Sequence, residues 1–174
     1  MRAAETAYSA EHHMASVNLI FDDEQTTYLR ELSEKMNLDF GEFIPHATLI
    51  NVTEQDIPRL KLAAAALPSL DKLVLDGVNF LPDEAGNCVC VELRVQKTSW
   101  MVEVRRKLLE MLDDIHPGLD IDGFRPHITL GIVEAGTLGD VDMSAIPRQL
   151  PVITKPRAAA CYNGVHGKVV EVVE

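Results

Sequence analysis

Residues 45–49 read Pro-His-Ala-Thr-Leu, and residues 126–130 read Pro-His-Ile-Thr-Leu. At average amino-acid usage, one match to Pro-His-x-Thr-Leu is expected in roughly one chain per thousand of this length. Each match also closes a segment that reads as strand, helix, strand, over residues 16–52 and 88–133. The two segments therefore form an internal repeat of two copies.

Apolar periodicity and helix-capping residues predict the elements of each copy. In the first copy, a strand over 16–21 precedes a helix that Asp22 or Asp23 caps and that runs to about residue 36. In the second copy, a strand over 88–95 precedes a helix that Thr98 or Ser99 opens and that runs to about residue 115. The remaining expected elements are the closing strands 45–52 and 126–133, a helix from Asp56 to about 67, a strand over 72–80 and a hairpin of 157–163 with 168–173.

This order of elements predicts an α+β fold with two pseudo-symmetric lobes. Each lobe is expected to be a small, mostly antiparallel sheet with helices on its outer face, and a central cleft between the lobes carries the two His-x-Thr motifs. Residues 1–15 are small and polar without periodicity, which predicts a flexible N-terminal tail. Residues 16–174 are expected to form a single bilobal domain.

The alternation of side chains along a strand separates each motif into two faces. Residues two apart share a face, so His46 and Thr48 point one way while Ala47 and Leu49 point the other. His127 and Thr129 are arranged in the same way in the second copy. A single strand histidine is ordinarily a packed residue, but the same pair at the end of both repeats favours a functional site in the cleft.

Paired imidazoles suit the cleavage of a phosphodiester. An in-line displacement at phosphorus needs a base beside the nucleophile and an acid beside the leaving oxygen, and two histidines across a cleft supply that pair. Near neutral pH one imidazole can be neutral while the other is protonated. The hydroxyls of Thr48 and Thr129 can donate hydrogen bonds to the non-bridging phosphate oxygens.

With these motifs the sequence resembles the 2H phosphoesterases, which include cyclic phosphodiesterases and 2'-5' RNA ligase-like proteins. The resemblance covers about residue 16 to the C-terminus and rests on His46-Ala47-Thr48-Leu49 and on Phe124 to Leu130. It implies hydrolysis of 2',3'-cyclic or related nucleotide phosphates, or of RNA ends, with no metal and no cofactor. His46 and His127 would be the acid/base pair, and Thr48 and Thr129 would hold the phosphate.

Two readings of the same residues remain open beside hydrolysis. One is the joining of RNA ends through a 2'-5' linkage, which uses the same groups in reverse. The other is a catalytically silent module that binds a nucleotide or RNA. The presence of both histidines and both threonines favours an enzyme, because binding alone does not require two proton-transfer groups.

Further candidates for substrate binding lie near the motifs. Arg125 is two residues before His127 and shares its face if the strand includes Pro126, so it can contact phosphate. Tyr162, and less favourably Trp100, can stack on a base. A row of alternating polar residues on the strand over 88–95 either lines the cleft or faces solvent; its members are Cys90, Glu92 and Arg94.

Composition limits the partners. The 174 residues carry 27 Asp and Glu against 16 Lys and Arg, a net charge of −11 that excludes a polybasic DNA binder. The chain has no long apolar run, its three cysteines have no metal-binding spacing, and neither motif brings further ligands for zinc. We therefore expect a cytoplasmic monomer whose partner is a small cyclic nucleotide or an RNA terminus, without DNA, membrane or metal.

Overall fold

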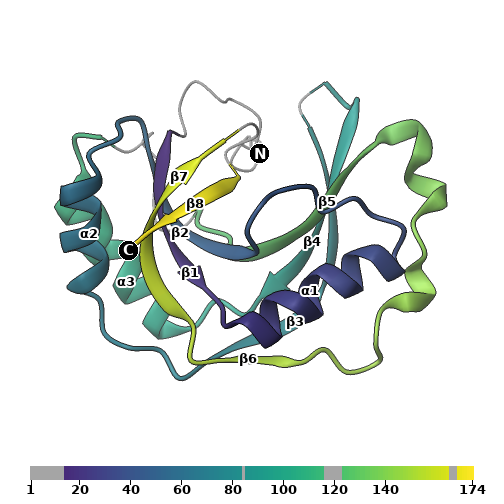
Figure 1. The fold of residues 1–174 in the computed structure, drawn as a ribbon, viewed down its shortest axis with the longest axis horizontal. Coiled ribbons are helices and arrows are strands. Elements are labelled where there is room, and N and C mark those ends of the chain that lie inside the picture. The colour runs from purple at the N-terminus through teal and green to yellow at the C-terminus, as the bar shows by residue number, and fades with distance from the viewer. Residues whose placement is uncertain (1–13, 84, 116–122, 165–167) are drawn as a thin grey trace.

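The computed structural model describes residues 14–83, 85–115, 123–164 and 168–174 (Figure 1). It confirms the predicted α+β class, with two four-stranded antiparallel sheets and helices packed against them. In chain order the elements are β1 (Ala15–Ile20), α1 (Asp23–Lys35), β2 (His46–Val52), α2 (Ile57–Ala65), β3 (Lys72–Pro82), β4 (Cys88–Val95), α3 (Ser99–Leu112), β5 (His127–Glu134), the 3-10 helices η2 (Ala135–Asp140) and η3 (Met143–Ala145), β6 (Val152–Thr154), β7 (Arg157–Asn163) and β8 (Val169–Val173).

The two sheets are built alike. Their strand orders are β2-β1-β7-β8 and β5-β4-β3-β6, so each motif strand is the edge strand of its sheet and pairs with the first strand of its own repeat. The motif strands β2 and β5 also approach each other, and the two sheets therefore meet along the edges that carry the motifs (Figure 1). This arrangement brings both repeats to one place.

The predicted caps fix the helix starts. The side chain of Asp22 accepts from the backbone N–H of Gln25 at 2.8 Å, and Asp56 and Thr98 make the equivalent contacts at the starts of α2 and α3. The helices end two to three residues before the expected residues 67 and 115. The short strand β6 and the two 3-10 helices were not predicted, since a three-residue strand carries too little periodicity to be recognised.

The helix of each repeat packs against the sheet of the other repeat. Helix α1 lies against β5, and helix α3 lies against β2. The hydroxyl of Ser33 on α1 donates to the carbonyl oxygen of Leu130 at 2.7 Å, and the guanidinium of Arg105 on α3 donates to that of Leu49 at 2.5 Å. Both leucines stand at the same place in the motif, three residues after the histidine.

The same two leucines interrupt the pairing of their strands. Val17 pairs with Ile50 and the next residue of β1 pairs with Thr48, so Leu49 has no partner across the ladder. On β5 the register shifts in the same way around Leu130. A bulged residue has a backbone group outside the ladder. The helix side chains from the opposite repeat supply the donors that these two carbonyls would otherwise lack.

One continuous hydrophobic core joins the two lobes, and it includes residues of both sheets and all three α-helices. A small second cluster lies on the other face of the first sheet; its buried members are Ile20, Ala159, Cys161 and Val169.

The expected tail falls mostly outside the described residues, as does part of the expected turn between β7 and β8, while β1 begins at Ala15. None of the helices in the described part of the chain is long and apolar enough to cross a membrane.

Candidate active site

The two motif histidines are held in the same way. Nδ1 of His46 lies 2.6 Å from the carbonyl oxygen of Ile44, and Nδ1 of His127 lies 2.9 Å from that of Arg125. A carbonyl can only accept, so in each ring Nδ1 carries the hydrogen. Nε2 is therefore the nitrogen that each neutral imidazole keeps available for proton transfer.

The motif threonines lie on the same sheet faces as the histidines, as the alternation predicts. In the first sheet Thr48 pairs with Asn18, and in the second Thr129 pairs with Glu92. Asn18 and Glu92 are equivalent in the two repeats, and both are fully buried. The pseudo-symmetry is thus broken by charge, since a neutral amide stands in one half where a carboxyl group stands in the other.

Lys168 is a member of the site that the sequence did not reveal. It precedes β8 in the first sheet and is only 5% exposed. Its ammonium donates to the hydroxyl of Thr129 at 2.6 Å. The bond therefore joins the C-terminal hairpin to the motif strand of the opposite lobe. Among the described residues no carboxylate forms an ion pair with Lys168.

His46 lies in an environment that disfavours its charged form. Burial is the larger cause, followed by the positive charge of Lys168, and together they lower the pKa of His46 from 6.5 to about 3. The hydrogen bond to Ile44 opposes this shift, and the nearby His127 adds to it. At neutral pH the His46 imidazole is therefore neutral, with a lone pair on Nε2.

His127 has a different neighbour. A carboxylate oxygen of Glu92 lies 3.5 Å from Nε2 of His127, while the other oxygen of the same carboxylate contacts the guanidinium of Arg125. The Glu92 side chain is completely buried. Of the alternating polar residues on β4, Glu92 thus lies in the site. Sγ of Cys90 lies 3.7 Å from the hydroxyl of Thr129. Arg94 instead pairs with Asp76 at 2.6 Å and is half exposed.

Tyr162 is not brought to the histidines. It pairs with Ala15 on the face of the first sheet that packs against the main core, whereas the neighbouring Cys161 is on the face of the small second cluster. Trp100, at the start of α3, also packs against the main core. We therefore leave both aromatic residues out of the site.

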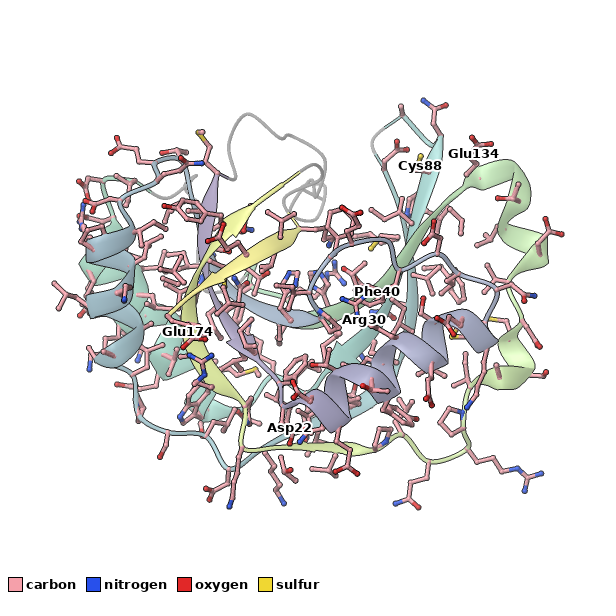
Figure 2. The ribbon with its side chains drawn as sticks, viewed as in Figure 1. Asp22, Arg30, Phe40, Cys88, Glu134 and Glu174 are labelled. Carbon is pink, nitrogen blue, oxygen red and sulfur yellow. The ribbon has the colours of Figure 1, made fainter. Side chains whose placement is uncertain are left out.

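A cavity of about 260 Å³ is lined by His46 of the first motif and Thr129 of the second, and by Phe40, which is labelled in Figure 2. His46, Thr129, Lys168 and the loop residue Asp39 form its polar part, and other residues of the loop between α1 and β2 and of β5 form the rest. Within the part of the chain that the structure describes, no group of three His, Cys, Asp or Glu side chains is arranged to hold a metal ion.

No family model and no curated protein matches this sequence. The fold is similar to that of a protein described as a phosphoesterase, with 15% identity, a TM-score of 0.52, and coverage of 94% of this chain and 97% of that one. Usb1 of Kluyveromyces marxianus is also similar, solved with uridine monophosphate (11% identity, TM-score 0.46, 78% of each chain) and alone (10%, 0.45, 79% of this chain and 77% of that one). The shared fold with the phosphoesterase agrees with the resemblance drawn from the two motifs.

Proposed function

We propose that this chain is a metal-independent phosphodiesterase of the 2H type, which hydrolyses 2',3'-cyclic or related nucleotide phosphates or RNA ends. The observation that carries the proposal is the setting of Lys168. A buried ammonium without a carboxylate partner is costly, and an anion bound beside it removes that cost. The groups beside it are a histidine and a threonine from the two motifs, which are the groups that phosphodiester cleavage requires.

In this proposal His46 accepts the first proton. Its lowered pKa keeps the imidazole neutral at neutral pH, and the hydrogen bond from Nδ1 to Ile44 leaves Nε2 as the basic atom. Nε2 removes a proton from the attacking water as the new P–O bond forms. The low pKa makes His46 a weak base, so the step gains from a bound phosphate, whose negative charge offsets Lys168 and raises the basicity of the ring.

His127 donates the second proton. Its Nε2 lies beside the carboxylate of Glu92, which stabilises the imidazolium form. The imidazolium protonates the leaving oxygen as the old P–O bond breaks, and the phosphorus keeps one oxygen from water. Glu92 thus acts as a positioning residue, and it is itself held by Arg125.

The phosphate oxygens are assigned to the remaining groups. Thr48, Thr129 and Lys168 donate hydrogen bonds to the non-bridging oxygens, where negative charge must be stabilised as the phosphorus becomes five-coordinate. Arg125 has a side chain that is 31% exposed even while it contacts Glu92. This exposure supports assigning Arg125 to an additional phosphate of the substrate.

Ligation and silent binding are the two alternatives. Joining RNA ends runs the same proton transfers in reverse. A silent module would need an anion site but not two histidines with matched Nδ1 hydrogen bonds and unlike neighbours. These features favour an enzyme.

The test is a panel of mononucleoside 2',3'-cyclic phosphates and short RNAs with cyclic or linear ends, assayed in excess EDTA. We expect turnover that EDTA leaves unchanged, and losses of about 10²–10⁴-fold in kcat for His46→Gln and His127→Gln. Phe80→Leu, on an exposed position of β3, is the matched control and should retain activity. Binding without turnover of any substrate, activity that needs a divalent ion, or near wild-type rates in either histidine variant would overturn the proposal.

A further inference from the structure

Strand β3 has an outer edge that its own sheet leaves open. Strand β4 pairs with one side of β3 from Leu75 to Pro82, whereas β6 pairs with the other side only at residues 72–74. In Figure 1 β6 lies at the bottom of the view, and the far end of the β3–β4 hairpin lies at the top. Over residues 76–82 the outer edge of β3 is therefore not paired with any strand in the described part of the chain.

The register fixes which backbone groups point away from the sheet. The N–H of Asp83 donates to the carbonyl oxygen of Cys88 at 2.9 Å, so these two residues form a hydrogen-bonded pair. Hydrogen-bonded and non-hydrogen-bonded pairs alternate along an antiparallel ladder. Residues 77, 79 and 81 therefore direct their N–H and C=O groups to β4, and Val78 and Phe80 direct theirs to the open edge.

This edge lacks the usual protection against pairing. Sheet edges are ordinarily protected by charged side chains, prolines or bulges. The stretch Gly77–Leu81, which we call the open stretch, carries no charge and no proline. The register shift between Leu75 and Gly77 precedes it, and Pro82, which has no N–H, follows it. Strand β8, at the edge of the first sheet, differs, because Glu171 at its centre would meet the same charge in a second copy.

The open stretch is complementary to a second copy of itself. In an antiparallel pairing about a twofold axis at Asn79, Val78 of each copy lies opposite Phe80 of the other. Since both residues direct their N–H and C=O groups outward, these two pairs make four backbone hydrogen bonds. Asn79 meets Asn79 of the second copy in a non-hydrogen-bonded pair, where side chains are closest, and each amide has both a donor and an acceptor.

Charges do not oppose this pairing, although the chain has a net charge of −11. The nearest charged side chain on the strand is Asp76, which pairs with Arg94 at 2.6 Å and would lie opposite Pro82 of the second copy. Aromatic and β-branched side chains that face each other across strands stabilise a sheet, and Val78 and Phe80 form such a pair. The Phe80 side chain is 36% exposed, so it is available for this contact.

A surface pocket leaves room for the incoming strand. One wall is the edge of β3 from Val74 to Val78, and the other is formed by residues 146–150 and Val152. Its charged members are Asp76 and Arg148, which have opposite signs. Because Phe80 of the second copy lies opposite Val78, its ring arrives at this pocket. The pocket and the exposed ring of one copy thus match those of the other, as a twofold interface requires.

We infer that the open stretch of β3 is an interface between two copies of this chain, which pair antiparallel about Asn79. This inference replaces the monomer expected from the sequence, and it does not depend on the proposed function. A twofold axis perpendicular to the sheet leaves the cleft faces of both copies on the same side of the dimer. The open stretch supplies five residues from each copy, against roughly 20–30 in a stable complex, so we expect a weak dimer.

Sedimentation velocity of the full chain tests the interface, at concentrations from about 10 to about 500 µM that suit a weak complex. We expect the mass to rise with concentration from that of one chain toward that of two. Asn79→Asp keeps the size of the side chain but places two carboxylates face to face on the axis, so it should weaken association at least about tenfold. Gln55→Glu adds the same charge at an exposed position of the other lobe and should associate like wild type.

A cross-link tests the register separately. Asn79→Cys brings two thiols together on the axis and should give a covalent dimer under mild oxidation, whereas wild type, with its own cysteines, and Leu62→Cys, at an exposed position of α2, should not. A single-chain mass throughout the concentration range overturns the inference. A dimer that Asn79→Asp does not weaken, or that Asn79→Cys does not capture, forms through another surface and also overturns it.

Discussion

The guanidinium of Arg105, on the helix of the second repeat, donates a hydrogen bond of 2.5 Å to the backbone carbonyl of Leu49 in the motif of the first. Ser33 makes the reciprocal bond from the first repeat to the second, at Leu130. Both acceptors are the bulged residues of their strands. The position of each motif strand is therefore set from the opposite half of the molecule.

The Ser33 bond gives a stability prediction. Ser33→Ala leaves the buried carbonyl of Leu130 without this donor and should lower the free energy of unfolding by about 1–3 kcal/mol. Urea denaturation measures this loss. The control is Ser69→Ala, at an exposed position, which should stay within about 0.5 kcal/mol of wild type. Equal stability of the two variants would mean that the bond does not hold the lobes together.

The low pKa of His46 makes folding depend on pH. Between pH 6.5 and about 3 the unfolded chain binds a proton at His46 that the folded chain does not, so stability falls as the pH falls through this range. From pH 6.5 to 4.5 this one group should cost wild type about 2 kcal/mol relative to His46→Gln, which has nothing to titrate there. Urea titrations at both pH values measure the difference, and parallel losses in the two proteins would contradict it.

Lys168 should shift the acidic limb of the activity profile. Its charge lowers the pKa of His46, so Lys168→Met should raise that pKa and move the acidic limb of kcat/KM to higher pH. The same variant should lose roughly 10²–10³-fold in kcat/KM through the missing phosphate contact. Lys168→Arg, which keeps the charge, is the control and should leave the limb near its wild-type position. If the acidic limb of kcat/KM does not move in Lys168→Met, the charge of Lys168 does not lower the pKa of His46.

Glu92 should support His127 in its protonated form. Glu92→Gln keeps the size of the side chain but removes the charge 3.5 Å from Nε2 of His127, so kcat should fall more than KM changes, because the contact supports proton donation and not substrate binding. Glu134→Gln, at the exposed end of β5, serves as the control. A raised KM with an unchanged kcat would contradict this role for Glu92.

The charges of the site predict how salt affects RNA of different lengths. Arg94 and Arg125 are paired with Asp76 and Glu92, so under the proposed function Lys168 is the main cation for the reacting phosphate and Arg125 can add one further contact. We expect a mononucleoside cyclic phosphate and a twenty-nucleotide RNA with the same end to react with similar kcat/KM. Each phosphate contact on a single strand adds about 0.7 to the slope of the logarithm of affinity against the logarithm of salt concentration. We expect a slope that corresponds to one or two contacts. A hundredfold preference for the long RNA, with a slope for six or more contacts, would reveal a basic groove.

The local parts of this site were predictable from the sequence, and the long-range parts were not. The period of two in a strand placed His46 and Thr48 on one face, and the capping residues located the helix starts. Lys168 reaches Thr129 across 39 residues, and no local pattern encodes that contact. Tyr162 shows the same limit: its strand was predicted with the right bounds, but small apolar residues occupy both faces of β7, so only the pairing with β1 decides which face meets the core.

The exchange of helices between the repeats has a consequence for the independence of the halves. In each strand–helix–strand segment the helix packs against the motif strand of the other segment. We therefore expect neither half to fold by itself, although each resembles a folding unit in the sequence. Within one chain the two segments should unfold together as a single cooperative body.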